Sequence, residues 1–302
     1  MSTQTLTRRA AVLINPSKVA DPGAMRRDIT AALDASGWPA PLWLETTEAD
    51  PGGGQTREAL AAGVGVVLVA GGDGTVMRCA TELAGGGVAL AVLPVGTGNL
   101  LARNLDLPTD LAEAVDVAVA GDRRRLDVGT FEGQCFTVMA GMGFDAEMMA
   151  DAPEGVKRRI GWPAYVLSAL RHLTDRPMRV RVSLDGGEAL RRRARTVLVA
   201  NLGRLQGGVP VVPDARPDDG ELDVAIIAPR TLRDWAALAW AVLRRLERPA
   251  LRETYRARRV LVEADRVHPR EMDGEVVEPG RTLAVEVRPG ALLLCVRPGR
   301  SG

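Results

Sequence analysis

The chain has 302 residues, of which 46% are hydrophobic and 25% are charged, and its formal net charge is +1. The length suits about two domains, and the composition is that of a soluble globular protein with a sizeable core. The near-neutral charge argues against a nucleic-acid partner. The apolar run at the N-terminus is too short for a signal peptide, and no run reaches the ~18 apolar residues of a membrane span. Three separated cysteines in apolar surroundings indicate reduced thiols in a cytoplasmic protein: Cys79, Cys135 and Cys295.

The first 127 residues alternate between expected strands and expected helices. Strands are expected at 10–14, 41–46, 64–70 and 88–96, and helices at 23–37, 55–63, 75–86, 98–105 and 110–122. The run 64–70 is apolar almost throughout, which is typical of a strand buried on both faces of a parallel sheet. We therefore predict an α/β domain with a doubly wound sheet over residues 1–127. In such sheets ligands bind at the carboxyl ends of the strands.

Strand-like segments dominate from about residue 125 onward. They lie at 124–131, 134–141, 179–186, 195–201, 221–228, 258–264 and 282–298. Turn signals such as Asp185-Gly186-Gly187 and Asp273-Gly274 separate them, and two helical inserts are expected at 161–173 and 232–246. We predict a second, β-rich domain over residues 128–302, an antiparallel sandwich whose last strand can return to the first domain.

Two glycine-rich loops follow the two most apolar strands and precede helices. They consist of Gly71, Gly72, Asp73, Gly74 and Thr75, and of Gly96, Thr97, Gly98 and Asn99. The amides at a helix N-terminus attract anions, so two such loops on adjacent strand ends predict a cradle for a polyphosphate. Asp73 could then serve the metal ion that accompanies it. The Gly-Lys-Ser/Thr ending of a P-loop is absent.

The order of these motifs resembles the catalytic family of diacylglycerol kinases and sphingosine kinases, in its soluble bacterial branch. "GGDGT" and "PVGTGN" carry most of the resemblance, and Asn15-Pro16 matches the first nucleotide loop of the family. Further matches are "FTVMAGMGFDAEM" with Asp145, "VVPDARPDDGELDV" at 211–224 and "MDGE" at 272–275. The matches keep their order from Asn15 to Glu275.

The resemblance implies a phosphofructokinase-like and NAD kinase-like α/β domain followed by a β-rich domain, with ATP and a lipid meeting in the cleft between them. It implies Glu275 as the general base on the lipid hydroxyl and Asp73 as a further catalytic residue. It implies a Mg²⁺ ion held by Asp219 and by the backbone carbonyls of Arg216 and Glu221. The implied ATP contacts are Asn15, Thr46, Gly71, Gly72, Asp73, Gly74, Thr75, Gly96, Thr97, Gly98 and Asn99.

The activity implied is that of an ATP- and Mg²⁺-dependent kinase of diacylglycerol or a related lipid. Such an enzyme is expected in the cytoplasm and at the inner membrane surface. A homodimer is one possible oligomeric state. The helix expected at 232–246 carries apolar residues at helical spacing, which favours packing on the second domain over a membrane-surface face. These apolar residues are Leu232, Trp235, Leu238, Ala239, Val242 and Leu246.

Two alternatives remain beside the lipid kinase. A kinase of a small metabolite such as NAD shares the "GGDGT" loop, although "GTGN" and "DGE" argue against it. A nucleotide- or lipid-binding protein with little turnover is the other alternative. Met77 and Arg78, where the family often has Asn-Glu, leave room for it, whereas Asp73 and Glu275 argue against it. The loop after Thr46, "EADPGGGQT", is also longer than expected of the family.

Overall fold

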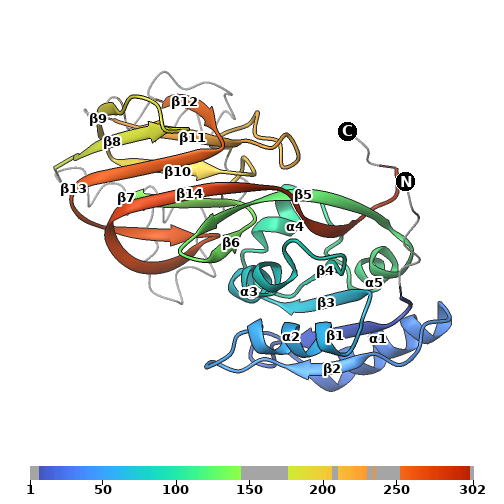
Figure 1. Ribbon diagram of the computed structural model, residues 1–302. Coiled ribbons are helices and arrows are strands. Elements are labelled where there is room, and N and C mark those ends of the chain that lie inside the picture. Colours follow the sequence, from blue (N-terminus) through green and yellow to red (C-terminus); the bar gives the residue numbers. More distant parts are fainter. Residues whose placement is uncertain (1–6, 144–175, 206–209, 230–233, 235–251, 300–302) are drawn as a thin grey trace. The chain divides into compact units, whose positions relative to one another are not determined.

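The chain folds into two compact units. The computed structural model describes residues 7–143, 176–205, 210–229, 234 and 252–299. Unit 1 comprises Met1–Leu126 and Gly290–Gly302, and unit 2 comprises Asp127–Pro289. Two long strands contribute residues to both units, β5 (Asp122–Phe131) and β14 (Glu275–Val296) (Figure 1).

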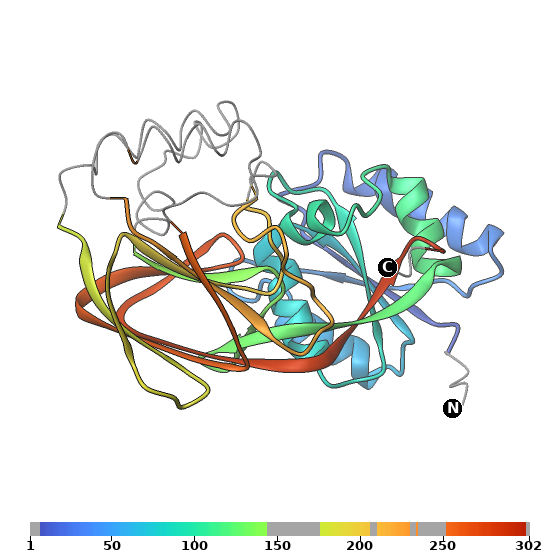
Figure 2. The ribbon, with the colours of Figure 1, turned by 90° about the horizontal axis from the view of Figure 1, so that it is seen from above.

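The sheet of unit 1 is parallel and has the strand order β14-β4-β3-β1-β2. Its other strands are β1 (Ala10–Ile14), β2 (Leu42–Glu45), β3 (Val66–Gly71) and β4 (Ala89–Pro94). Every residue of β1 and β3 is buried, as the apolar run 64–70 predicts for a strand covered on both faces. Figure 2 shows the helices of this unit packed around the strands.

The described residues of unit 1 form five helices: α1 (Pro22–Ala35), α2 (Gly53–Ala61), α3 (Asp73–Leu83), α4 (Leu100–Asn104) and α5 (Leu111–Ala120). α1 and α5 share one hydrophobic core with alternate residues of β1, β3 and β4. α2 packs against α3, which contacts β3 and β4. Asp21 and Asp110 begin α1 and α5 as side-chain caps, which satisfies amides that have no partner within the helix. The predicted α/β domain is confirmed.

Unit 2 is built from antiparallel strands, which confirms the predicted β-rich domain. Its main sheet has the order β12-β11-β10-β7-β13-β14. Off this path, β8 pairs with both β13 and β9, and β5 pairs with β6. The strands are β6 (Gln134–Phe136), β7 (Met139–Gly143), β8 (Met178–Leu184), β9 (Leu190–Ala194), β10 (Thr196–Ala200), β11 (Leu222–Ile227), β12 (Arg252–Ala257) and β13 (Arg259–Met272). A bulge between Glu263 and His268 lets β13 pair with β8 before it and with β7 after it.

Several details of the second domain differ from the sequence prediction. The strand expected at 134–141 is broken into β6 and β7, because the backbone of Thr137 to Met139 donates to a side chain instead of to a neighbouring strand. Two strands of polar sequence were not expected, β9 with "LRRRA" and β12 with "RETYRA". β13 and β14 also run on to the Asp273-Gly274 turn, beyond the strands expected at 258–264 and 282–298. The two helical inserts expected at 161–173 and 232–246, and Asp145, lie outside the described residues apart from Asp234.

Cys79, Cys135 and Cys295 are free and buried. Burial raises the pKa of the Cys79 and Cys295 thiols to about 12, so both stay neutral. This agrees with the expectation of reduced thiols.

Candidate functional site

The residues expected to contact ATP gather at one edge of the sheet of unit 1. Asn15 follows β1, Thr46 follows β2, and the two glycine loops end β3 and follow β4. The amide of Asn15 donates to the Ala70 carbonyl at 2.8 Å, and the amide of Thr46 donates to the Ile14 carbonyl at 2.9 Å. Because the strands are parallel, their carboxyl ends lie at this same edge, as predicted.

Asp73 joins the two glycine loops. It opens α3, and its Oδ1 accepts a hydrogen bond of 2.6 Å from the amide of Leu100, the first residue of α4. The loops also touch directly, because a Cβ added at Gly96 would lie 2.9 Å from the Cα of Gly72. Asn99, in the left-handed conformation at φ 48°, closes the second loop by donating from its side chain to the Gly96 carbonyl at 2.7 Å.

Three features leave this edge ready for an anion. The N-terminus of α3 has no side-chain cap, and a helix N-terminus attracts anions. A Cβ added at Gly72 would meet no atom within 4 Å, so the space beside this backbone is open. The Thr46 hydroxyl is buried, with 4% of the residue exposed, and its Oγ1 has no hydrogen-bond partner among the described residues. A buried hydroxyl of this kind is usually satisfied, so a ligand oxygen is its natural partner.

Two further residues among the expected ATP contacts have structural partners. Thr75 is buried beneath Gly71, where an added Cβ would lie 2.7 Å from the Thr75 Cβ. The Asn15 side chain accepts hydrogen bonds from the amide and the hydroxyl of Ser17 at 3.1 and 2.7 Å. Thr97, in contrast, is exposed between Gly96 and Gly98.

In unit 2, Glu275 is the first residue of β14 and its side chain is exposed. It follows the tight turn Asp273-Gly274, whose φ angles of 45° and 85° are those of a two-residue hairpin turn. Met272 and Glu275 pair across this turn. The turn therefore fixes the position of Glu275 at the start of β14.

A buried carboxylate holds this turn. Asp273 is 2% exposed, and its Oδ2 accepts from the Thr137 amide and hydroxyl at 2.7 and 2.8 Å. Its Oδ1 accepts from the amides of Val138 and Met139 at 2.8 and 3.0 Å. Burial raises the pKa of Asp273, and these hydrogen bonds act in the opposite direction. On the other side, Glu271 Oε2 accepts from the Gly274 amide at 3.0 Å.

The expected metal ligands lie on the loop 216–221 before β11. Asp219 Oδ1 accepts from the Glu221 amide at 3.1 Å, and its Oδ2 lies 3.8 Å from the Arg256 guanidinium. Burial raises the pKa of the neighbouring Asp223, the Arg256 charge lowers it, and the charges of Asp219 and Asp214 raise it further. The Arg256 guanidinium thus faces both Asp219 and Asp223. No group of three His, Cys, Asp or Glu side chains suited to a metal occurs among the described residues.

Asp127 is a residue that the sequence analysis did not single out. It is 2% exposed, its Oδ2 accepts from the Gly220 amide at 2.6 Å, and its own amide donates to the Pro217 carbonyl at 2.6 Å. Asp127 therefore fixes the loop that carries Asp219. An aspartate inside the apolar strand segment "RRLDVGTF" was the available signal, since a buried carboxylate needs partners.

Two family models together match most of the chain. The diacylglycerol kinase catalytic domain matches residues 9–131, and the YegS C-terminal NAD kinase beta sandwich-like domain matches residues 137–296. A protein of Pseudomonas fluorescens named probable lipid kinase YegS-like is 31% identical, with 95% of each chain covered. A diacylglycerol kinase of Bacillus subtilis is 32% identical over 62% of this chain and 63% of its own.

Among solved structures, a diacylglycerol kinase from Bacillus anthracis has a TM-score of 0.76 at 26% identity, covering 96% of this chain and 98% of that one. An NAD kinase from Archaeoglobus fulgidus has a TM-score of 0.51 at 16% identity, covering 95% of this chain and 93% of its own, and this likeness concerns the fold alone. In the part of the chain that the structure describes, no helix is both long and apolar enough to cross a membrane.

Proposed function

Because this chain belongs to the diacylglycerol kinase family of lipid kinases, we propose that it transfers the γ-phosphoryl group of ATP to a hydroxyl of diacylglycerol or a related lipid. Such a substrate resides in a bilayer, so the proposal includes action at the inner membrane surface by a cytoplasmic enzyme. The observation that carries the proposal is the pair of glycine loops that Asp73 joins through Leu100, with open space beside Gly72.

Phosphoryl transfer asks a protein for positioning and charge stabilisation rather than covalent chemistry. The amides at the N-terminus of α3 and the glycine loops would hold the phosphate oxygens, and the hydroxyls of Thr46 and Thr97 would donate to ATP. Glu275 is the proposed base. An alcohol is a far weaker acid than a carboxylic acid, so the Glu275 carboxylate would orient the lipid hydroxyl and accept its proton late.

We propose Mg²⁺ as the ion required. The Asp219 carboxylate with the backbone carbonyls of Arg216 and Glu221 forms an all-oxygen donor set, which suits magnesium. When bound, the ion would neutralise this acidic loop and stabilise its fold. Asp73 is the carboxylate of the glycine loops and is proposed to serve the ion that accompanies ATP.

A kinase of a soluble nucleotide is the second candidate, because the fold is shared with an NAD kinase. The two candidates differ in their acceptor, so one assay separates them. The assay offers ATP with a labelled γ-phosphate to a panel of lipids in mixed micelles and, separately, to NAD as a soluble acceptor. We expect the label to appear in a lipid. Asp73→Ala should remove this product, because it detaches α4 from the first glycine loop. Labelled NADP without labelled lipid would overturn the lipid assignment, and no product with any acceptor would favour a binding protein.

Replacement of Gly72 by alanine tests the phosphate cradle directly. The φ of −86° suits alanine, and the new methyl group would meet no protein atom within 4 Å, so folding should be unaffected. The methyl group would fill the space proposed for phosphate, and we expect the Kd for ADP to rise about tenfold or more. Isothermal titration with ADP measures this, and the melting temperature controls for folding.

Gly96→Ala is the matched comparison, because its methyl group would collide with the Gly72 Cα at 2.9 Å. This variant should lose both melting temperature and ADP affinity. Unchanged ADP affinity in Gly72→Ala would place the nucleotide elsewhere.

A further inference from the structure

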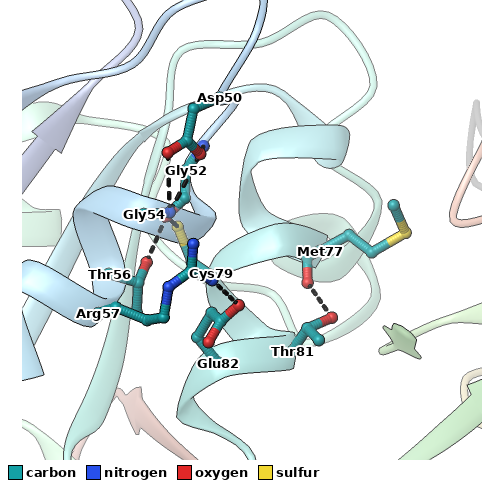
Figure 3. Close-up of polar contacts among 9 residues, drawn as sticks. All are labelled: Asp50, Gly52, Gly54, Thr56, Arg57, Met77, Cys79, Thr81 and Glu82. Carbon is teal, nitrogen blue, oxygen red and sulfur yellow. Dashed lines mark hydrogen bonds and ion pairs between the residues drawn. The ribbon is translucent and has the colours of Figure 1, made fainter. Parts of the chain in front are cut away.

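The loop after Thr46 is tied together by one carboxylate. The Thr47 amide donates to the Asp50 carbonyl at 3.0 Å, and the Asp50 amide donates to the Thr47 hydroxyl at 3.0 Å, so a closed turn follows Thr46 directly. The Asp50 carboxylate then accepts from the amides of Gly52 at 3.3 Å and Gly54 at 3.0 Å, at the start of α2 (Figure 3). Asp50 thus binds the turn to the helix that follows.

The same loop is anchored to the end of β2. The Gln55 side-chain amide donates to the carbonyls of Glu45 at 3.1 Å and Asp50 at 3.3 Å. Glu45 precedes Thr46, so Thr46 lies between two segments that the first residues of α2 hold in place. Its buried Oγ1 is left without a partner among the described residues.

On its other side the loop lies against α3. The Gly52 carbonyl accepts from the Thr56 hydroxyl at 2.7 Å and from the Cys79 thiol at 3.9 Å, which stays protonated because burial raises its pKa to about 12 (Figure 3). Gly52 has a φ of 139°, and an added Cβ would lie 3.0 Å from the Cys79 sulfur and 3.4 Å from the Thr75 Cγ2. Gly52 therefore touches the first turn of α3, where the glycine loop ends.

We propose that Asp50 is a positioning residue for the nucleotide site: its carboxylate ties the turn next to Thr46 to the start of α2 and seats Gly52 against Thr75, and it thereby sets the affinity for the phosphates of ATP. This inference rests on the proposed function. Two observations carry it independently, the hydrogen bonds of Asp50 on the backbone and the buried unpartnered hydroxyl of Thr46 beside that turn.

The test compares three variants. Asp50→Ala removes the acceptor of the Gly52 and Gly54 amides, while Asp50→Asn keeps one oxygen that can accept from them. Arg57→Ala is the control, because Arg57 pairs with Glu82 between the same two helices and has a side chain that is 62% exposed (Figure 3). The readouts are the Kd for ADP by titration, KM for ATP, KM for lipid, kcat and the melting temperature.

We expect Asp50→Ala to raise the Kd for ADP and the KM for ATP about tenfold, with kcat at saturating ATP and KM for lipid changed less than about twofold. Asp50→Asn should recover much of the ADP affinity, and Arg57→Ala should match the parent. An ADP affinity unchanged in Asp50→Ala, or weakened as much by Arg57→Ala, would overturn the inference. The ADP titration needs no acceptor. A parent that binds ADP but phosphorylates no lipid would refute the proposed function alone, and a parent that binds no ADP would refute both.

Discussion

Glu275→Gln is expected to lower kcat for lipid phosphorylation by about 10²–10⁴-fold, the usual contribution of a general base. The amide can still hydrogen-bond to the lipid hydroxyl but cannot accept its proton. Glu275 lies exposed at the start of β14, so the substitution should leave the fold and the ADP affinity unchanged. Single-turnover transfer of labelled phosphate measures the chemical step.

Glu278→Gln supplies the control for Glu275. Glu278 is another exposed carboxylate of β14, three residues further along the strand, so it reports any general effect of losing a negative charge there. We expect Glu278→Gln to keep parental kcat. A Glu275→Gln protein with parental kcat would assign the base to another residue, and equal losses in both variants would indicate an electrostatic effect of the strand.

The α/β half was predictable because its signals are local. Continuous apolar runs marked the strands buried on both faces, and the glycine loops marked the strand ends. Parallel pairing then brings those ends to one edge, which is why Asn15, Thr46 and the two loops meet. What was not predictable is how the two loops are joined, since the Asp73 carboxylate reaches Leu100, 27 residues further along the chain.

The β-rich half was harder to predict because long-range hydrogen bonds decide its details. A strand at 134–141 was expected from β-propensity, yet a carboxylate about 135 residues away takes up the amides at its centre. The role of Asp127 could not be predicted for the same reason, because its hydrogen-bond partners Pro217 and Gly220 lie far along the chain. The "DGE" motif alone resembled an exposed turn, whereas the structure buries its first residue and exposes its last.

Replacement of the buried Asp273 is expected to have the largest effect on the stability of the fold. Asp273→Ala leaves the amides of Thr137, Val138 and Met139 without their acceptor inside unit 2. Each buried donor left unpaired costs about 1–3 kcal/mol, so we expect the free energy of unfolding to fall by about 3–5 kcal/mol. Urea denaturation followed by tryptophan fluorescence and circular dichroism measures this loss.

Asp185 offers a matched control, because it occupies the same kind of turn with φ angles of 51° at Asp185 and 76° at Gly186. Its carboxylate accepts from the amides of Arg258 and Arg259 at 2.9 and 2.8 Å, but it is exposed, so water can replace it. Asp185→Ala should cost only about 1 kcal/mol. Equal losses at Asp185 and Asp273 would mean that turn conformation, rather than the buried carboxylate, stabilises the hairpin. A much larger loss at Asp273 would show that its buried hydrogen bonds stabilise the hairpin that carries Glu275.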